Sequence, residues 1–391
     1  MDEETRLIRA GLHPEELART VGPPIQKGST VLLPNAAALY DDDAFVTYGR
    51  KGLAPHAALT HALAQMEGAA GACLYPSGLA ALTGAMLAVL EAGDQVLVAD
   101  CIYNPTRRFC DKVLARYGVA VRYFDPEQSP EALVGEASDK VRLIVLESPG
   151  SLTFEMQDLS RIAELARQRG ILTMADNTWG AGYLFKPLEH GIDISVQALT
   201  KYVGGHSDVF MGSACARDDR LFRRLDDGIM HLGWAVSPED AYQMLRGLRT
   251  LPTRLERQGA SALKVAAWLQ AQDEVAEVLF PALPGARHHH LWKRDWRGAC
   301  GLFSVVLKPA SAHAVDALLD ALSLFGLGFS WGGFESLAIS CDPQLNKRRH
   351  RKDYGGPLVR FHIGLEHPDD LIADLRIGLD AYRIAAAAPA P

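Results

Sequence analysis

Strand-like and helix-like segments alternate along the chain from about residue 55 to residue 235, and this alternation limits the fold more than any other feature. The continuous apolar run "VRLIVLE" (residues 141–147) is typical of a central parallel strand. The helical segment that follows begins after a capping Asp158 and ends at Gly170. Strands that alternate with helices predict a mostly parallel α/β sheet covered on both faces.

The same reasoning gives the expected elements and domains. Helices are expected at residues 78–91, 106–117, 159–169 and 238–272, and strands at 95–99, 119–124, 141–147, 171–176, 192–199 and 209–216. A smaller C-terminal α+β domain is expected from strands at 301–307 and 358–365 and helices at 313–326 and 368–385. We therefore expect an extended N-terminal arm at 1–54, a large domain at 55–245 and a small domain at 246–391.

Composition narrows the class of function. The net charge of −7 argues against a general nucleic-acid binder. No apolar run is long enough to span a bilayer, and the acidic N-terminus lacks the apolar segment of a secretory signal, so we expect a cytoplasmic location and no membrane partner. The six cysteines lack CxxC spacing and are expected to be buried thiols. The histidine run 288–290 is expected to be a solvated loop, and no metal site is expected.

Chemistry-bearing side chains follow several of the predicted strands. Tyr103 comes after strand 95–99, Asp176 ends strand 171–176, and Lys201 follows strand 192–199. Because ligands bind at the carboxyl ends of the strands in open α/β sheets, these three groups are expected to converge. Taken singly, Lys201 is better explained as a solvent-exposed charge at a strand end than as a reactive amine. Asp176 alone could be a helix or loop cap. Tyr103 alone is equally well explained as a packing residue and as a ligand-stacking ring.

The start of helix 78–91 offers a site for an anion. Ser77 and Gly78 stand where free backbone amides and the helix dipole favour phosphate, although "PSGLAA" alone is usually only a helix cap. Neither a GxxxxGK[ST] loop nor a GxGxxG turn is present, so a P-loop or dinucleotide site is not supported. A phosphate site, an aromatic ring, a carboxylate and a lysine are together the groups that pyridoxal phosphate requires.

Longer motifs agree with that chemistry. The segments "QALTKYVGGHSD", "ESPGS", "MADNTWGAGYLFKPLEHGIDIS", "YGRKG", "YPSGLAAL", "FSWGGFESL" and "VRFHIGLEHPDDLIADL" extend over nearly the whole chain. In them the chain resembles the β-lyase branch of the Cys/Met-metabolism family of fold-type I pyridoxal-phosphate enzymes. The resemblance implies the transferase-like fold of that class, with a mostly parallel large domain and a smaller C-terminal α+β domain.

The resemblance also implies roles for individual residues. Lys201 would form the Schiff base with the cofactor, Asp176 would pair with the pyridine nitrogen, and Tyr103 would stack on the ring and join in catalysis. Phosphate would be bound by Thr200 and by the amides of Gly78 and Leu79, with Tyr48 and Arg50 reaching the cofactor of a neighbouring subunit. Substrate would be bound by Arg360, through its α-carboxylate, and by Ser330 and Trp331, which would line that end of the pocket.

The implied reaction is α,β-elimination of an amino-acid thioether, with L-cystathionine giving homocysteine, pyruvate and ammonia. A homo-oligomer is implied as well, at least a dimer with shared active sites and by expectation a tetramer. Ala198 stands where many relatives have a phosphate-binding serine, and Gly150-Ser151 and Trp331 differ from γ-acting relatives. A γ-acting enzyme and a non-catalytic pyridoxal-phosphate-binding protein remain the alternatives.

Overall fold

A computed structural model of the chain describes residues 2–11, 20–40 and 46–387. The chain divides into two compact units. The first unit comprises Met1–Glu91 and Leu172–Pro252, and the second comprises Ala92–Ile171 and Thr253–Pro391. The predicted domain boundaries after residues 54 and 245 stay predictions.

The first unit contains four strands in the order β1-β7-β6-β5. They are β1 (Gly71–Tyr75), β5 (Leu172–Asp176), β6 (Ile194–Ala198) and β7 (Gly212–Ala216). β5 and β6 run parallel, whereas β7 runs antiparallel to both β6 and β1. No crossover helix separates β6 from β7, so the chain returns beside β6 in the opposite direction. The sheet is therefore mixed at this place.

The helices of the first unit pack on these strands and on one another. They are α1 (Glu3–Arg9), α2 (Ala54–Glu67), α3 (Gly78–Val89), α7 (Asp219–Leu232) and α8 (Pro238–Leu248), with 3₁₀ turns η1 (Ala36–Tyr40), η2 (Gly49–Lys51) and η4 (Pro187–His190). α3 packs against β6, β7 and α7, which explains why its sequence is small and apolar over most of its surface. The Ser77 hydroxyl caps α3 by accepting a hydrogen bond from the amide of Ala80 at 3.1 Å.

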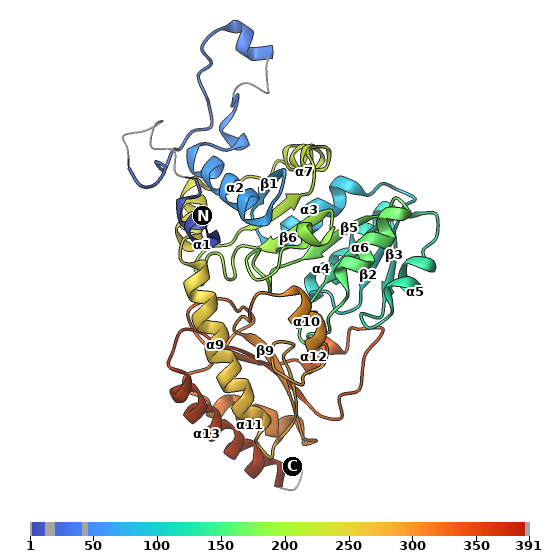
Figure 1. Cartoon of the computed structure of the whole chain (residues 1–391), viewed down its shortest axis with the longest axis vertical. Helices are drawn as coiled ribbons and strands as arrows, with labels where there is room; N and C mark the ends of the chain where they lie inside the picture. Colours follow the sequence, from blue (N-terminus) through green and yellow to red (C-terminus); the bar gives the residue numbers. More distant parts are fainter. Residues whose placement is uncertain (1, 12–19, 41–45, 388–391) are drawn as a thin grey trace. The chain divides into compact units, whose positions relative to one another are not determined.

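An extended segment precedes α2. Residues 20–35 are almost entirely without helix or strand, and in Figure 1 the blue segment that carries η1 extends away from α2. The arm expected at 1–54 thus has an extended stretch, while residues 12–19 and 41–45 of it lie outside the described residues.

The second unit contains a parallel sheet in the order β4-β2-β3. Its strands are β2 (Gln95–Ala99), β3 (Ala120–Phe124) and β4 (Val141–Glu147), joined by α4 (Asn104–Lys112), η3 (Leu114–Tyr117) and α5 (Pro130–Gly135) and followed by α6 (Leu159–Gln168). Asp158 caps α6 by accepting from the Arg161 amide at 3.1 Å. Gly170, with φ +67°, follows the helix in the left-handed conformation that glycine tolerates best. The predicted limits of α6 are confirmed.

The rest of the second unit is an α+β arrangement, as expected. A five-stranded sheet has the order β10-β11-β12-β9-β8 and is antiparallel except between β10 and β11. Its strands are β8 (Val275–Leu279), β9 (Leu302–Leu307), β10 (Gly326–Leu327), β11 (Leu337–Ser340) and β12 (Leu358–His362). Its helices are α9 (Leu251–Gln270, begun in the first unit), α10 (His289–Asp295), α11 (Ala312–Ala321), α12 (Asp342–Leu345) and α13 (Pro368–Ala387).

The prediction of a solvated loop at the histidine run is wrong. His289 and His290 begin α10, and His288 precedes it in the left-handed conformation, with φ +60°. The ring of His288 contacts Glu127 at 3.2 Å, and His289 Nδ1 contacts the Pro281 carbonyl at 2.8 Å. One of these partners, Glu127, lies far away in the sequence, and a run of like residues gives no sign of such a contact.

Two further expectations concern the cysteines and membrane-spanning helices. All six cysteines are buried, as the apolar segments around them predict. Among the described residues, no helix is both long and apolar enough to cross a membrane.

Close packing of α8 on the chain after β6 generates a stability prediction. A Cβ on Gly247 would overlap the carbonyl oxygen of Val203 and lie 2.6 Å from that of Gly204. We expect Gly247→Ala to lower the free energy of unfolding by about 1–3 kcal/mol, because two backbone segments would have to separate. Denaturant unfolding measures this. Gly135→Ala is the matched control, since a Cβ at this helical position meets open space; equal loss in both variants would contradict the packing argument.

Candidate active site

Asp176 ends β5 as a buried carboxylate. Its Oδ1 accepts hydrogen bonds from the amide and the hydroxyl of Thr178, at 3.1 and 2.5 Å. Burial raises the pKa of Asp176, whereas the two hydrogen bonds from Thr178 and the positive charge of Lys201 oppose that rise. A buried anion that is held by two donors and faces a cation is arranged to interact with a further positive group.

Lys201 lies in the turn that follows β6. Its amide donates to the Ala198 carbonyl at 3.1 Å, and its carbonyl accepts from the amide of Gly205 at 2.8 Å. Gly205 has φ +71°, so glycine is the residue best suited to this turn. The structure therefore brings Lys201 and Asp176 close enough for their charges to interact, as the strand-end argument predicts.

The beginning of α3 packs directly on the end of β6. A Cβ on Gly78 would overlap the Cβ of Ala198 and lie 2.8 Å from its Cα, so the backbone of α3 approaches β6 as closely as glycine allows. The amides of Gly78 and Leu79 belong to the first turn of α3 and have no carbonyl partner within that helix. These amides and the turn of Lys201 thus lie at one end of the same layer.

Thr200 has defined partners of its own. Its hydroxyl donates to the Met211 carbonyl at 3.1 Å and accepts from the Met211 amide at 2.9 Å. A hydroxyl has a single proton, so Thr200 would have to exchange its partner before it could donate to a phosphate. The predicted phosphate contact of Thr200 stays a prediction.

Tyr48 and Arg50 lie on either side of Gly49, at the end of the N-terminal arm. Tyr48 is about half exposed and forms an isolated antiparallel bridge with Thr30. Arg50 Nη1 donates to the Met230 carbonyl at 3.0 Å, at the end of α7. Their predicted contact with a neighbouring subunit's cofactor stays a prediction.

In the second unit, Tyr103 directly precedes α4, after β2. Its amide donates to Glu147 Oε2 at 2.7 Å, and Glu147 is the last residue of β4. Tyr103 is 42% exposed, and its predicted stacking on the cofactor ring stays a prediction. The Glu147 carboxylate thereby joins the ends of β2 and β4, and Glu147 was not predicted to be a site residue from the sequence.

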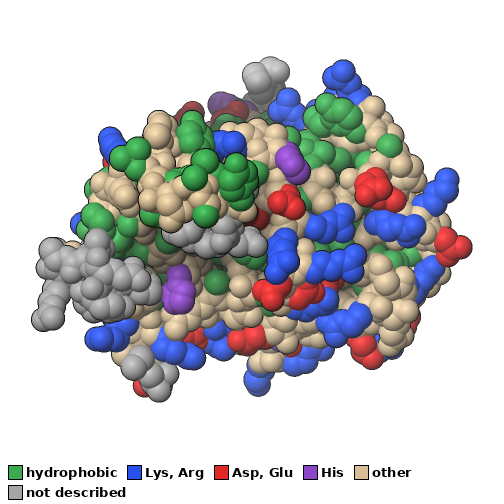
Figure 2. All heavy atoms as spheres, turned by 90° about the horizontal axis from the view of Figure 1, so that it is seen from above, with side chains coloured by type: hydrophobic (Ala, Val, Ile, Leu, Met, Phe, Trp, Pro, Cys, Tyr) green, Lys and Arg blue, Asp and Glu red, His purple; other side chains and the backbone are tan. Residues whose placement is uncertain are grey.

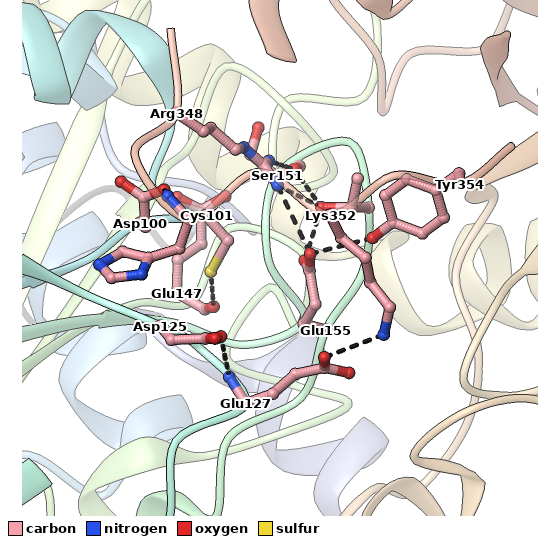
Figure 3. A network of polar contacts seen from close by, with 12 residues as sticks. Asp100, Cys101, Asp125, Glu127, Glu147, Ser151, Glu155, Arg348, Lys352 and Tyr354 are labelled. Atoms are coloured by element: carbon pink, nitrogen blue, oxygen red, sulfur yellow. Dashed lines mark hydrogen bonds and ion pairs between the residues drawn. The ribbon is translucent and has the colours of Figure 1, made fainter. Parts of the chain in front are cut away.

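The segment after β4 is held by a polar network (Figure 3). Arg348 Nη1 donates to the Thr153 hydroxyl at 2.6 Å and lies 3.5 Å from Glu155, and Nη2 contacts the Ser151 carbonyl. Glu155 also accepts from the hydroxyl of Tyr354 at 3.2 Å. The only sequence signal for this network was the basic stretch at residues 347–352, which contains Arg348.

Gly150 lies inside the same segment. A Cβ on Gly150 would lie 2.6 Å from both Cβ and Sγ of Cys101. A larger residue at position 150 would therefore require Cys101 to move, which gives a physical reason for the glycine that the sequence analysis noted.

Arg360 lies on β12 and holds the segment after β10. Its Nη2 donates to the carbonyls of Phe329 and Ser330, both at 3.0 Å. The guanidinium thus has two carbonyl partners, and its predicted contact with a substrate carboxylate stays a prediction. Ser330 is exposed and Trp331 half-buried.

Two further side chains support this segment. His362, two residues along β12 and so on the same face as Arg360, accepts from the Gly332 amide at 3.0 Å. Gln258 donates to the Gly333 carbonyl at 2.7 Å. Neither side chain was predicted as a site residue from the sequence. The two-residue spacing from Arg360 was a partial signal for His362.

The predicted site residues thus fall into two sets. Lys201, Asp176, Thr200, Gly78, Leu79, Tyr48 and Arg50 belong to the first unit, and Tyr103, Arg360, Ser330 and Trp331 belong to the second. Contacts within each set are described above, and the placement of one set against the other stays a prediction.

Known proteins resemble the chain over almost its full length. Residues 4–380 match the family model described as Cys/Met metabolism PLP-dependent enzyme. A cystathionine beta-lyase of Bordetella avium is 41% identical over 379 residues, with 95% of each chain covered. An L-alanine/L-glutamate racemase of Wolbachia pipientis is 37% identical over 395 residues, with 97% of each covered.

A solved structure agrees. The metB structure from Corynebacterium glutamicum superimposes with a TM-score of 0.90 at 28% identity, covering 97% of this chain and 98% of that one. The α/β fold expected from the resemblance is thereby confirmed, and pyridoxal phosphate is the cofactor of the matching family. The chain is an enzyme that belongs to the Cys/Met-metabolism family of pyridoxal-phosphate-dependent enzymes, among its carbon–sulfur lyases.

Proposed function

We propose that the enzyme catalyses α,β-elimination of L-amino-acid thioethers and converts L-cystathionine to homocysteine, pyruvate and ammonia. The observation that carries the proposal is the buried Asp176 carboxylate facing Lys201 at the ends of two adjacent parallel strands. A relative named for cystathionine β-lyase activity, 41% identical over almost the whole chain, supports the choice of reaction.

The side chains present fit the cofactor. Asp176 is a buried carboxylate suited to a protonated ring nitrogen, Lys201 supplies an amine, and the amides of Gly78 and Leu79, at the start of α3, suit a phosphate. Gly78 has no side chain, so the start of α3 can approach Ala198 closely. When bound there, pyridoxal phosphate supplies an electron sink for charge that develops on the substrate Cα.

The remaining steps fall to residues of the chain. We expect Arg360 to fix the substrate through its α-carboxylate, since two of its N–H groups already hold the adjoining segment rigidly. The Lys201 amine acts as general base at Cα and returns a proton to the leaving thiolate, alone or with a tyrosine. Tyr103 would cover a face of the cofactor ring, and Tyr48 of a neighbouring subunit would help to deprotonate the incoming amine.

Two rival reactions share the proton transfer at Cα. γ-Elimination is disfavoured by Gly150-Ser151, where a close contact with Cys101 requires the glycine, and by Trp331. Racemisation is the second candidate because a racemase is 37% identical to the chain. A product assay separates them: pyruvate from cystathionine indicates β-cleavage, 2-oxobutyrate indicates γ-cleavage, and D-alanine from L-alanine indicates racemisation.

We also propose a homo-oligomer with active sites shared between subunits, most simply a tetramer built from dimers. Val21, Leu32 and Tyr40 in the N-terminal arm are 77%, 92% and 88% exposed in the single chain. Figure 2 shows hydrophobic side chains gathered on part of one face, with basic and acidic side chains interspersed elsewhere. Apolar side chains this exposed favour burial against a second copy. The buried cysteines are consistent with the proposed cytoplasmic location.

Replacement of the lysine tests the central assignment. We expect Lys201→Ala to lower pyruvate release from cystathionine by at least roughly 10²–10⁴-fold, the usual contribution of a positioned base. The visible absorbance of covalently attached cofactor should disappear in the same variant. Lys112→Ala, which removes an exposed lysine at the end of α4, serves as the control. Wild-type turnover in Lys201→Ala would overturn the assignment.

The proposed phosphate site gives a second test. We expect Gly78→Ala to weaken cofactor binding, because the added Cβ would push the first turn of α3 away from Ala198. Cofactor titration followed by absorbance or fluorescence measures the change, which should be about tenfold or more for a lost hydrogen bond to a charged group. Leu79→Ala is the matched control, because the proposed ligand at that position is the backbone amide; a larger loss there would contradict the proposal.

A further inference from the structure

A buried glutamate lies against the strands that carry Asp176 and Lys201. Glu67 is the last residue of α2 and its side chain has no exposed surface. Its Oε1 accepts hydrogen bonds from Ser195 Oγ at 3.1 Å and from Gln197 Nε2 at 2.8 Å, both on β6. Gly182 also packs closely against this carboxyl group, since a Cβ at position 182 would lie 2.7 Å from Glu67 Oε1.

The second carboxyl oxygen of Glu67 lacks a donor. Oε2 is buried and has no hydrogen-bond partner among the described residues, and the same is true of Asn177 Oδ1. Asn177 is among the side chains that interact with Glu67. Asn177 Nδ2 donates to the Phe185 carbonyl at 2.9 Å, which fixes Oδ1 as the remaining acceptor. A buried oxygen without a donor is costly, and a proton on Glu67 Oε2 would let it donate to the unpaired Asn177 Oδ1.

The charges around Glu67 also disfavour its ionised form. The cation that acts on it is Lys186, which already pairs with Glu3 at 2.5 Å and with Glu189 at 3.8 Å. The other titratable group packed against it is the buried thiol of Cys215 on β7, which contributes no positive charge. Glu67 also ends α2, where the helix dipole disfavours a negative charge. Burial raises the pKa of Glu67 to about 7.

We propose that Glu67 is a positioning residue that is protonated in the folded enzyme, its Oε2–H donating to Asn177 Oδ1 while Oε1 accepts from Ser195 and Gln197. In this arrangement the un-ionised Glu67 side chain connects Asn177, which follows Asp176, with β6, the strand that precedes Lys201. The effect on turnover rests on the proposed roles of Asp176 and Lys201, whereas the protonation state of Glu67 does not.

The pH dependence of stability tests the protonation state. The pKa of Glu67 is raised from an ordinary 4.5 to about 7, so the folded state holds an extra proton within that window. The contribution of Glu67 to stability is therefore lost as pH rises through the window. Glu67→Gln carries no such proton. We expect its melting temperature, relative to wild type, to rise between about pH 5 and about pH 8.

The holoenzyme is used throughout, with Glu256→Gln, an exposed glutamate on α9, as the matched control that should show no such trend. Infrared difference spectra of wild type and Glu67→Gln should contain the carbonyl band of an un-ionised carboxylic acid below pH 7. A melting-temperature difference that is the same at both pH values, or the absence of that band, would overturn the proposal.

Kinetics test the positioning role. A glutamine can accept through Oε1 and donate through Nε2, so Glu67→Gln should retain kcat and KM close to wild type. Glu67→Ala leaves three polar partners unsatisfied and should lower kcat by about tenfold or more, with a smaller change in KM. If Glu67→Gln is impaired as strongly as Glu67→Ala, an ionised carboxylate is required and the proposal fails.

The two proposals fail in different ways. If wild type releases no keto acid from any thioether, the proposed function is wrong, while the melting and infrared results still decide the state of Glu67. If Glu67→Ala does not fold, the glutamine variant alone carries the test.

Discussion

The attraction between a buried carboxylate and a lysine at neighbouring strand ends is the interaction on which the rest of the structure depends. Asp176 is costly to bury, and two hydrogen bonds from Thr178 together with the charge of Lys201 offset that cost. Parallel pairing of β5 with β6 places the two residues at the same edge. Side chains farther out serve to keep these two strand ends in place.

That support comes from two kinds of contact. Glycines at positions 78 and 247 allow α3 and α8 to approach the chain around Lys201 with their backbones in contact. Beside these strands, the buried Glu67 accepts hydrogen bonds from Ser195 and Gln197 of β6. Close packing and buried hydrogen bonds thus both support the strand that leads into Lys201.

Much of the architecture could be predicted from the sequence. Apolar runs ending in Asp176 and Glu147 gave strands with the expected ends, and Asp158 and Gly170 gave the limits of α6. The direction of β7 and the helix at His289 could not be predicted in this way, since each depends on a partner far along the chain or on loop geometry. The roles of His362, Gln258 and Arg348 depend on distant backbone carbonyls and amides, so the spacing of His362 and the basic stretch around Arg348 were only partial signals.

By itself, the sequence determined most of the strand and helix pattern, because this follows from local periodicity. Through its resemblance to known proteins, it also determined the family and the cofactor of that family. Only the tertiary structure decided that Thr200 is bonded to Met211, that Gly150 must be small beside Cys101, and that Glu67 Oε2 is buried without a donor among the described residues. The physical reason is that burial and hydrogen-bond satisfaction are properties of surroundings that distant segments create, and no local pattern of residues contains them.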